Sequence, residues 1–326
     1  MTEPPDRDYR LPAETLMTEP LGEETLPVEE ESAARPGKRR RARGQLEDIW
    51  RRYRRNKLAM VGLGMVLVLV VVALLAPFIA PYDPQQQNLL NTIEPPSAEH
   101  WFGTDTLGRD VFSMMLYGLR LALMVGVGTM LGSLLIGVTV GAIAGYFGRS
   151  WDSVLMRVTD IFLAFPYLIG AIVIVRSIDP GQTKGAWPVA LALIILGWTT
   201  TARLMRGQVL ALREAEYVEA ARSIGASSGR IVLRHVLPNA IAPVLVYAFT
   251  SIGVAVVAMA ALSFLGVGVG IETPEWGQMI SQGFKNFGVP NTSYLWIFPS
   301  IAIIVTTLAF AFVSDGLRDS LDPKLR

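Results

Sequence analysis

The sequence contains no cysteine, only two histidines and few charged residues. Without cysteine there is no disulfide, no thiolate catalysis and no cysteine-ligated zinc or iron–sulfur site. His100 and His235 are far apart in the sequence, which argues against a histidine-rich metal site or a haem pocket. Charged residues make up 17% of the 326 residues, against about 25% in a typical soluble domain. Apolar residues make up 51%, and their long runs indicate a membrane protein.

The sequence also lacks the local motifs of several enzyme classes. It has no G-x-x-x-x-G-K-[ST] phosphate loop, so the chain itself is not expected to hydrolyse ATP. It has no H-E-x-x-H zinc motif and no G-x-S-x-G nucleophile elbow. A net charge of +1 gives no support for nucleic-acid binding by the whole chain. We therefore predict no catalytic residue, no metal ligand, no cofactor and no nucleic-acid partner.

Residues 1–45 are predicted to be a disordered cytoplasmic tail, first acidic and then basic. Residues 1–34 carry ten carboxylates and no apolar run long enough for a core or a signal peptide. Eleven basic residues follow between Arg35 and Lys57, and we expect them to contact anionic lipid or to fix the orientation in the membrane. A nucleic-acid arm is the alternative, but the apolar run that begins at Leu58 favours the membrane.

Six apolar stretches are long enough to cross a membrane, which needs about 20 residues each. They predict an all-α integral membrane protein with six transmembrane helices. The fourth stretch is the shortest and, with three consecutive threonines, the most polar. An N-terminal module at residues 46–116 would hold the first span and an external segment, and residues 117–326 would form a domain with the other five. The predicted spans are Leu58–Ala80, Leu121–Phe147, Val154–Val175, Pro188–Met205, Ile241–Leu265 and Tyr294–Val313.

Basic residues are distributed unevenly between the loops. With the N-terminus inside, 24 lysines and arginines fall in inside segments and 5 in outside segments. The positive-inside rule therefore predicts that both termini are cytoplasmic and that residues 85–116 lie outside.

Few polar features lie within the predicted spans. Arg157 and Asp160, one helical turn apart near the cytoplasmic end of the third span, predict a structural ion pair. The weakly polar Thr250, Ser251 and Ser263 of the fifth span are candidates for lining a translocation pathway. A stripe of glycines in the second span indicates close helix packing, either within the chain or against a second membrane subunit. Its members are Gly128, Gly132, Gly137, Gly141 and Gly145.

The inside loop between the fourth and fifth spans is long and rich in helix formers. We expect a short helix that stops at Gly225, since glycine suits the left-handed position after a helix end. Ser227 or Ser228 would cap a second short helix over Gly229–Val236, and Pro238 would start the next element. The result is a helix–turn–helix at the membrane surface. The alternative is a hairpin that merely connects two spans.

This loop resembles the EAA signature of permease subunits of ABC importers. The match is carried by Glu219, Ala220 and Ala221, then Gly225, and finally Leu237 and Pro238. His235, two positions before Leu237, is similar to the variant in the peptide/nickel branch of the family. The resemblance implies a coupling helix that docks into a cytoplasmic ATPase, with Glu219 fixing the hairpin by accepting hydrogen bonds. It also implies that His235 contacts the loop or the ATPase and is not a metal ligand.

Other motifs extend the resemblance over residues 46–326. The segment from His100 to Asp110 resembles the H-x-x-G-T-D-x-x-G-R-D motif of C-type dipeptide/oligopeptide permeases, and Pro274-Glu275-Trp276-Gly277 is similar to the family's outer segment. The resemblance implies the type I ABC importer permease fold in a bacterial inner membrane. The implied partners are membrane lipid, a B-type permease, two ATPase subunits and an extracytoplasmic binding protein.

The resemblance implies short peptides as substrates. Nickel chelates, glutathione or oligosaccharides, which relatives move, remain alternatives. The alternative from a different class of transporter is a proton-coupled secondary transporter. The predicted spans lack the series of carboxylates that proton coupling needs.

Overall fold

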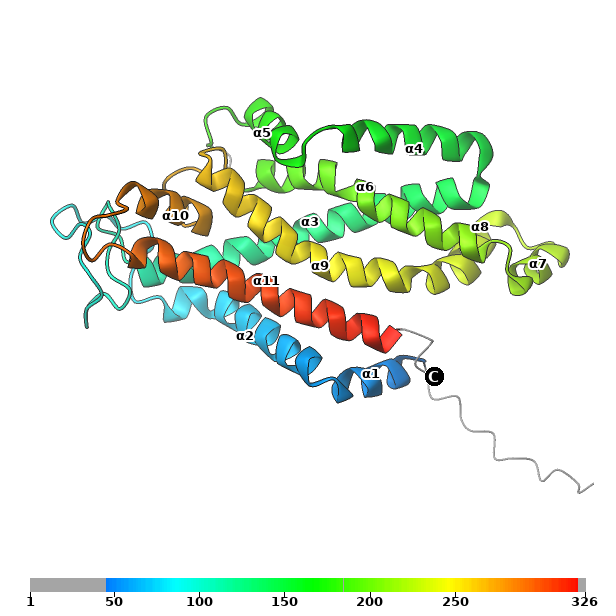
Figure 1. Cartoon of the computed structure of the whole chain (residues 1–326), viewed down its shortest axis with the longest axis horizontal. Coiled ribbons are helices and arrows are strands. Elements are labelled where there is room, and N and C mark those ends of the chain that lie inside the picture. The colour runs from blue at the N-terminus through cyan, green and yellow to red at the C-terminus, as the bar shows by residue number, and fades with distance from the viewer. Residues whose placement is uncertain (1–44, 184, 322–326) are drawn as a thin grey trace, which may run out of the picture. The chain divides into compact units, whose positions relative to one another are not determined.

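The computed structural model describes residues 45–183 and 185–321, so all but the last residue of the predicted tail lies outside the described residues. Within these ranges the regular structure is helical, with one isolated bridge between Thr104 and Asp110 (Figure 1). The helices are α1 (Gln45–Arg55), α2 (Lys57–Ile79), α3 (Val111–Phe147), α4 (Arg149–Ala164), α5 (Tyr167–Ile178), α6 (Trp187–Leu212), α7 (Glu216–Ser223), α8 (Ser228–Ile231), the π-helix η1 (Val232–Val236), α9 (Leu237–Phe264), α10 (Trp276–Lys285) and α11 (Tyr294–Leu321).

Five helices of the described chain are long and apolar enough to cross a membrane. They are α2, α3, α6, the continuous run from α8 to α9, and α11, and they confirm five of the six predicted spans. Backbone polar groups inside a bilayer must be paired within the segment, which only a helix or a closed barrel achieves. The predicted all-α membrane fold is therefore confirmed.

The remaining predicted span, Val154–Val175, is not one straight helix. The chain breaks after Ala164, and α4 and α5 meet at 90°. Pro166 disfavours the helical conformation of the residue before it, and Phe165 is extended with φ −82° and ψ 132°. With 16 and 12 residues, neither helix is long enough to cross alone. The third predicted span is therefore a bent pair of helices, and the chain has the six predicted spans if this pair counts as one.

Helix α3 packs along α6 more extensively than any other pair of helices in the described chain. A Cβ atom on Gly137 would lie 2.5 Å from the Cβ atom of Thr201, so a larger residue would push the helices apart. The glycine stripe therefore packs mainly within the chain, which decides between the two readings left open by the sequence. Among the glycines of the stripe, only Gly128 would place a Cβ atom with no other atom within 4 Å. The other stripe members that face α6 are Gly132, Gly141 and Gly145.

Helix α1 precedes the first span and packs against α11. The hydroxyl of Tyr53 donates to the carbonyl oxygen of Ala59 at 3.1 Å, and burial raises the pKa of Tyr53. Trp50 is exposed, and four arginines of the predicted basic run lie on this helix. An exposed tryptophan among arginines suits the boundary between lipid and water.

The segment between α2 and α3 is organised by a buried ion pair. Arg109 is 1% exposed, and its Nη2 atom lies 2.6 Å from Oδ2 of Asp105. Its Nη1 atom donates to the carbonyl oxygen of Ile271 at 2.9 Å, which ties the segment to the loop before α10. The other carboxylate oxygen of Asp105 accepts the backbone N–H groups of Leu107 and Arg109. This part of the H-x-x-G-T-D-x-x-G-R-D motif therefore has a structural role.

The same motif fixes the start of α3. Asp110 accepts the backbone N–H of Ser113 at 2.7 Å, as an N-cap does, and its other oxygen lies 2.9 Å from Nδ1 of His100. From α11, the Tyr294 hydroxyl lies 2.8 Å from the carbonyl oxygens of both Glu94 and Thr104 and donates to one of them.

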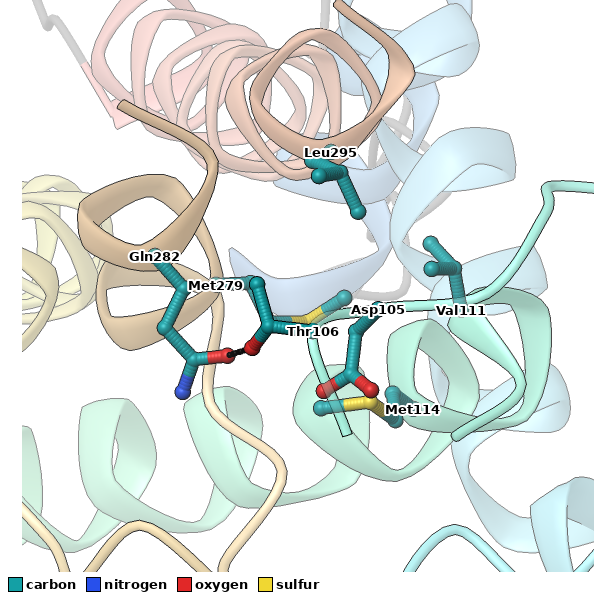
Figure 2. A pocket seen from close by; sticks show the side chains of 7 residues that line it. All are labelled: Asp105, Thr106, Val111, Met114, Met279, Gln282 and Leu295. Atoms are coloured by element: carbon teal, nitrogen blue, oxygen red, sulfur yellow. Dashed lines mark hydrogen bonds between the residues drawn. The ribbon is translucent and has the colours of Figure 1, made fainter. Parts of the chain in front are cut away.

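Figure 2 shows the segment docked between helices. Asp105 and Thr106 lie against Met114 of α3 and against Met279 and Gln282 of α10. The Thr106 hydroxyl lies 3.5 Å from Oε1 of Gln282. The space between these side chains is about 10 Å³, room for about one water. The segment between α2 and α3 is therefore closely packed on the transmembrane helices.

Helix α10 begins at a buried carboxyl group. Glu275 accepts the backbone N–H of Gln278 at 2.8 Å and caps the helix. Burial raises the pKa of the Glu275 carboxyl, and the hydrogen bonds from the backbone of Gly277 and Gln278 act in the opposite direction. The cap thus satisfies a backbone donor at the expense of burying an acidic group.

We predict that Arg109→Gln destabilises the fold far more than the same change at the exposed Arg120. The substitution leaves Asp105 buried without its charge partner, which costs about 3–5 kcal/mol in comparable buried pairs. Thermal unfolding of the purified protein in detergent measures the difference. Equal melting temperatures of the Arg109→Gln and Arg120→Gln variants would show that the pair does not hold the segment.

Candidate coupling surface

Helix α6 continues past the predicted end of the fourth span to Leu212 and leads into a helical hairpin. We call residues 213–238 the hairpin: it contains α7, the turn at Gly225, α8 and η1. Figure 1 shows α7 and α8 at the end of the helices opposite to α10. The second arm of the hairpin, Ser228–Val236, agrees within one residue with the predicted helix. It runs on into α9 without a break, so the hairpin is joined directly to two long helices.

The turn of the hairpin is a Schellman motif centred on Gly225. Gly225 has φ +79°, its N–H donates to the carbonyl oxygen of Arg222 at 3.0 Å, and the N–H of Ala226 donates to that of Ala221 at 3.1 Å. These bonds satisfy carbonyl groups at the end of α7 and reverse the chain. The predicted helix stop at Gly225 is therefore confirmed. Ser227 occupies the expected N-cap position of α8, but its side chain makes no cap hydrogen bond.

One face of the hairpin is buried against α6 and α9. Ala221 is buried, as are the other apolar residues on this inner face. Burial of apolar surface holds the hairpin against the transmembrane helices. The buried cluster consists of Ala142, Met205, Val209, Val218, Ala221, Ile231, Val236, Ala240 and Val244.

The outer face of α7 is exposed and mixed in character. Glu219 and Ala220 lie on it, and Ile224 at its end is 85% exposed. Tyr217 is also exposed. Apolar side chains beside a charged one on a projecting helix are typical of a protein contact site. Within the described chain the Glu219 carboxylate makes no hydrogen bond or ion pair, so its expected role in fixing the hairpin is not seen.

The last three residues of the predicted site lie at the base of the hairpin. His235 is half-buried in η1, Leu237 is half-buried at the start of α9, and Pro238 is exposed. The wide π turn precedes Pro238, whose ring cannot continue regular helix bonding to the residue four positions earlier. Asn239 instead donates its Nδ2 to the carbonyl oxygen of His235 at 2.6 Å. These residues shape the joint between the hairpin and α9.

Two ion pairs attach α4 to α6 above the hairpin. Both Nε and Nη2 of Arg206 donate to the carboxylate of Asp152, the second at 2.7 Å. Asp160 pairs with Nη2 of Arg203 at 2.5 Å. The predicted pair of Asp160 with Arg157 is therefore wrong: the partner comes from another helix. Arg203 on α6 faces the Asp160 carboxylate directly, whereas Arg157 lies one turn earlier on the same helix as Asp160.

The three predicted pathway residues do not face one common space. The hydroxyl of Thr250 lies 2.7 Å from that of Ser314, which places Thr250 against α11. Ser263 is buried near the end of α9, close to Gly268. Ser251 lines a cavity between α3, α6 and α9.

Sequence reasoning missed several residues of this region. Tyr217 precedes the recognised signature and Ile224 lies within it, but neither was predicted as a site residue. Arg203 and Arg206 were counted only among the basic residues that set the orientation. Asp152 was not considered. Two arginines three residues apart at the end of an apolar stretch are a signal that they need acidic partners on a neighbouring helix.

Comparison with known proteins gives consistent results over most of the chain. Residues 137–326 match the family of binding-protein-dependent transport system inner membrane components. Residues 44–96 match the N-terminal transmembrane domain of oligopeptide transport permease C.

Three curated relatives illustrate the similarity. The dipeptide transport system permease protein DppC of Alkalihalophilus pseudofirmus is 40% identical over 279 residues, which are 86% of this chain and 90% of that protein. The oligopeptide transport system permease protein OppC of Bacillus subtilis is 41% identical over 282 residues, again 86% and 90%. The glutathione transport system permease protein GsiD of Escherichia coli is 39% identical over 283 residues, with the same coverage.

Proposed function

Since the chain belongs to the family of binding-protein-dependent transport system inner membrane components, we propose that it is the C-type permease subunit of an ATP-driven peptide importer. The hairpin is the single feature that carries this proposal. It is a rigid, exposed element between two long helices, and such an element transmits a rigid-body movement at one end to the other.

In this proposal a cytoplasmic ATPase subunit binds the outer face of α7. Ile224 and Tyr217 supply apolar contact area, and Glu219 and Ala220 lie between them. Ala221 and Gly225 keep the hairpin closed, while His235, Leu237 and Pro238 form its joint with α9. The full importer would contain two ATPase subunits, a B-type permease and an extracytoplasmic binding protein, with lipid around α1 and the spans.

Short peptides are the proposed cargo, because dipeptide and oligopeptide permeases are among the most similar relatives. Glutathione is the second candidate, since a glutathione permease is nearly as similar. Glutathione is itself a tripeptide, so the two candidates differ in the side chains and linkage of the cargo more than in its backbone. Uptake of labelled dipeptides, tripeptides and glutathione by the reconstituted importer tests the choice.

We predict that Gly225→Val uncouples the ATPase while leaving membrane insertion intact. A β-branched residue is strained at φ +79°, so the turn opens and α7 shifts. Gly229→Val is the matched control, because Gly229 has open space around it and an ordinary φ. The readout is ATPase activity of the reconstituted importer, with and without peptide-loaded binding protein. We expect stimulation to fall several-fold only in the Gly225→Val variant. Equal stimulation in both variants would make the hairpin a passive connector.

We further propose that the hairpin and both termini are cytoplasmic and that the segment between α2 and α3 is external. The uneven distribution of basic residues supports this orientation. The chain has no cysteine of its own, so Leu90→Cys and Ser227→Cys give single labelling sites at exposed positions.

A membrane-impermeant thiol reagent added to intact cells should label the Leu90→Cys variant and not the Ser227→Cys variant. Inside-out vesicles should give the opposite pattern. Labelling of Ser227→Cys in intact cells would invert the proposed orientation.

A further inference from the structure

A cavity of about 210 Å³ lies between α3, α6 and α9, beside the joint of α4 and α5. Its lining comes from the middle of the three long helices. Side chains with hydroxyl groups make up much of the lining, and the residues that line it include no charged one. The lining hydroxyl groups include those of Thr129, Ser133, Thr199, Thr200, Tyr247 and Ser251.

Two of these hydroxyl groups are buried and have no hydrogen-bond partner within the described residues. Thr129 and Ser133 are 5% and 6% exposed, and they lie one turn apart on α3. A buried hydroxyl without a partner destabilises the folded structure. This cost is offset if a bound group supplies the missing partner.

Several other hydroxyl groups in the described helices donate to a carbonyl group of their own helix. Thr199 donates to the carbonyl oxygen of Leu196, and Ser251 donates to that of Ala248. Thr139, Thr159 and Ser300 donate to the carbonyl group four residues earlier. The unpaired hydroxyl groups of Thr306 and Thr307 do not line this cavity. Thr129 and Ser133 therefore differ from Thr199 and Ser251, whose hydroxyl groups also belong to the cavity lining but are already bonded.

Gly197 of α6 lies directly against the hydroxyl group of Ser133. A Cβ atom on Gly197 of α6 would lie 2.9 Å from Oγ of Ser133. At the rim of the cavity, Leu163, Thr200 and Val254 are exposed, so the cavity opens toward a side that this chain does not cover. A ligand can therefore enter the cavity from that side.

The chemistry of the cavity selects a neutral group that both donates and accepts hydrogen bonds. A charge at the middle of the spans would have no counter-charge here, and an acyl chain would leave both hydroxyl groups unpaired. A peptide amide satisfies them, and the cavity of about 210 Å³ has room for one. We propose that Ser133 and Thr129 bind a main-chain amide of the peptide in transit. This inference rests on the proposed function.

Main-chain binding would let the cavity accept peptides of different side chains, since every peptide bond presents the same N–H and C=O groups. The permease would then contribute little to side-chain selection. Ser133 and Thr129 would act as positioning residues that hold the backbone while the helices move.

The test compares an amide with an ester in the complete importer. Uptake of trialanine and of its analogue with the central amide replaced by an ester is measured in proteoliposomes. Both are supplied at concentrations that saturate the binding protein, as checked by direct binding, so that the rates report on the permease. We expect the wild type to carry the amide about two- to tenfold faster, the range of one net hydrogen bond.

Three variants locate the effect. Ser133→Ala removes the hydroxyl, and Gly197→Ala covers it without removing it; both should bring the amide-to-ester ratio close to 1. Ser300→Ala is the matched control, since it makes the same change at a hydroxyl that is already bonded and lies outside the cavity, and it should keep the wild-type ratio.

Each failure has its own signature. A wild type without preference for the amide, or a Ser133→Ala variant that keeps the preference, would show that the cavity holds only water or lipid and would overturn the inference. The proposed function would survive that result. Absence of any uptake of trialanine by the wild type would overturn the proposed function itself and the inference with it.

Discussion

The close approach of α3 and α6 is the contact on which the rest of the described structure depends. Gly132, Gly137, Gly141 and Gly145 leave no space for side chains between the two backbones, so the C-terminal half of α3 packs closely along α6. Because lipid gives helices no hydrophobic reason to associate, this packing must supply the attraction. Helix α6 in turn holds α4 through two ion pairs and carries the hairpin at its end. A change at the hairpin therefore reaches every element attached to α6.

The proposed binding cavity and the proposed coupling surface share these helices. Helices α6 and α9 line the cavity at their middles and bury the inner face of the hairpin at their ends. A shift of α7 would move both helices together, because the hairpin is packed between them and continues into α9 without a break. Rigid helices with a packed joint are a physical route for coupling ATP hydrolysis to a change at the cavity.

Local chemistry explains which features the sequence predicted. The five long spans follow from apolar runs that must pair their own backbone, and the turn at Gly225 follows from the left-handed conformation that ends many helices. The break at Phe165 was less visible, because Pro77, Pro243 and Pro299 lie inside α2, α9 and α11 without ending them. The partner of Asp160 lies 43 residues away on another helix, which no local pattern reveals. The cavity with Thr129 and Ser133 exists only through the packing of three helices.

The most direct measurement of the central claim is photo-crosslinking from the tip of the hairpin in the assembled importer. A photoreactive amino acid replaces Ile224, which is 85% exposed. In a control it replaces Leu90 of the segment between α2 and α3, which is 93% exposed. The account predicts a covalent adduct with the ATPase subunit from position 224 and none from position 90. An adduct of position 224 with lipid alone, or with the binding protein, would contradict the account.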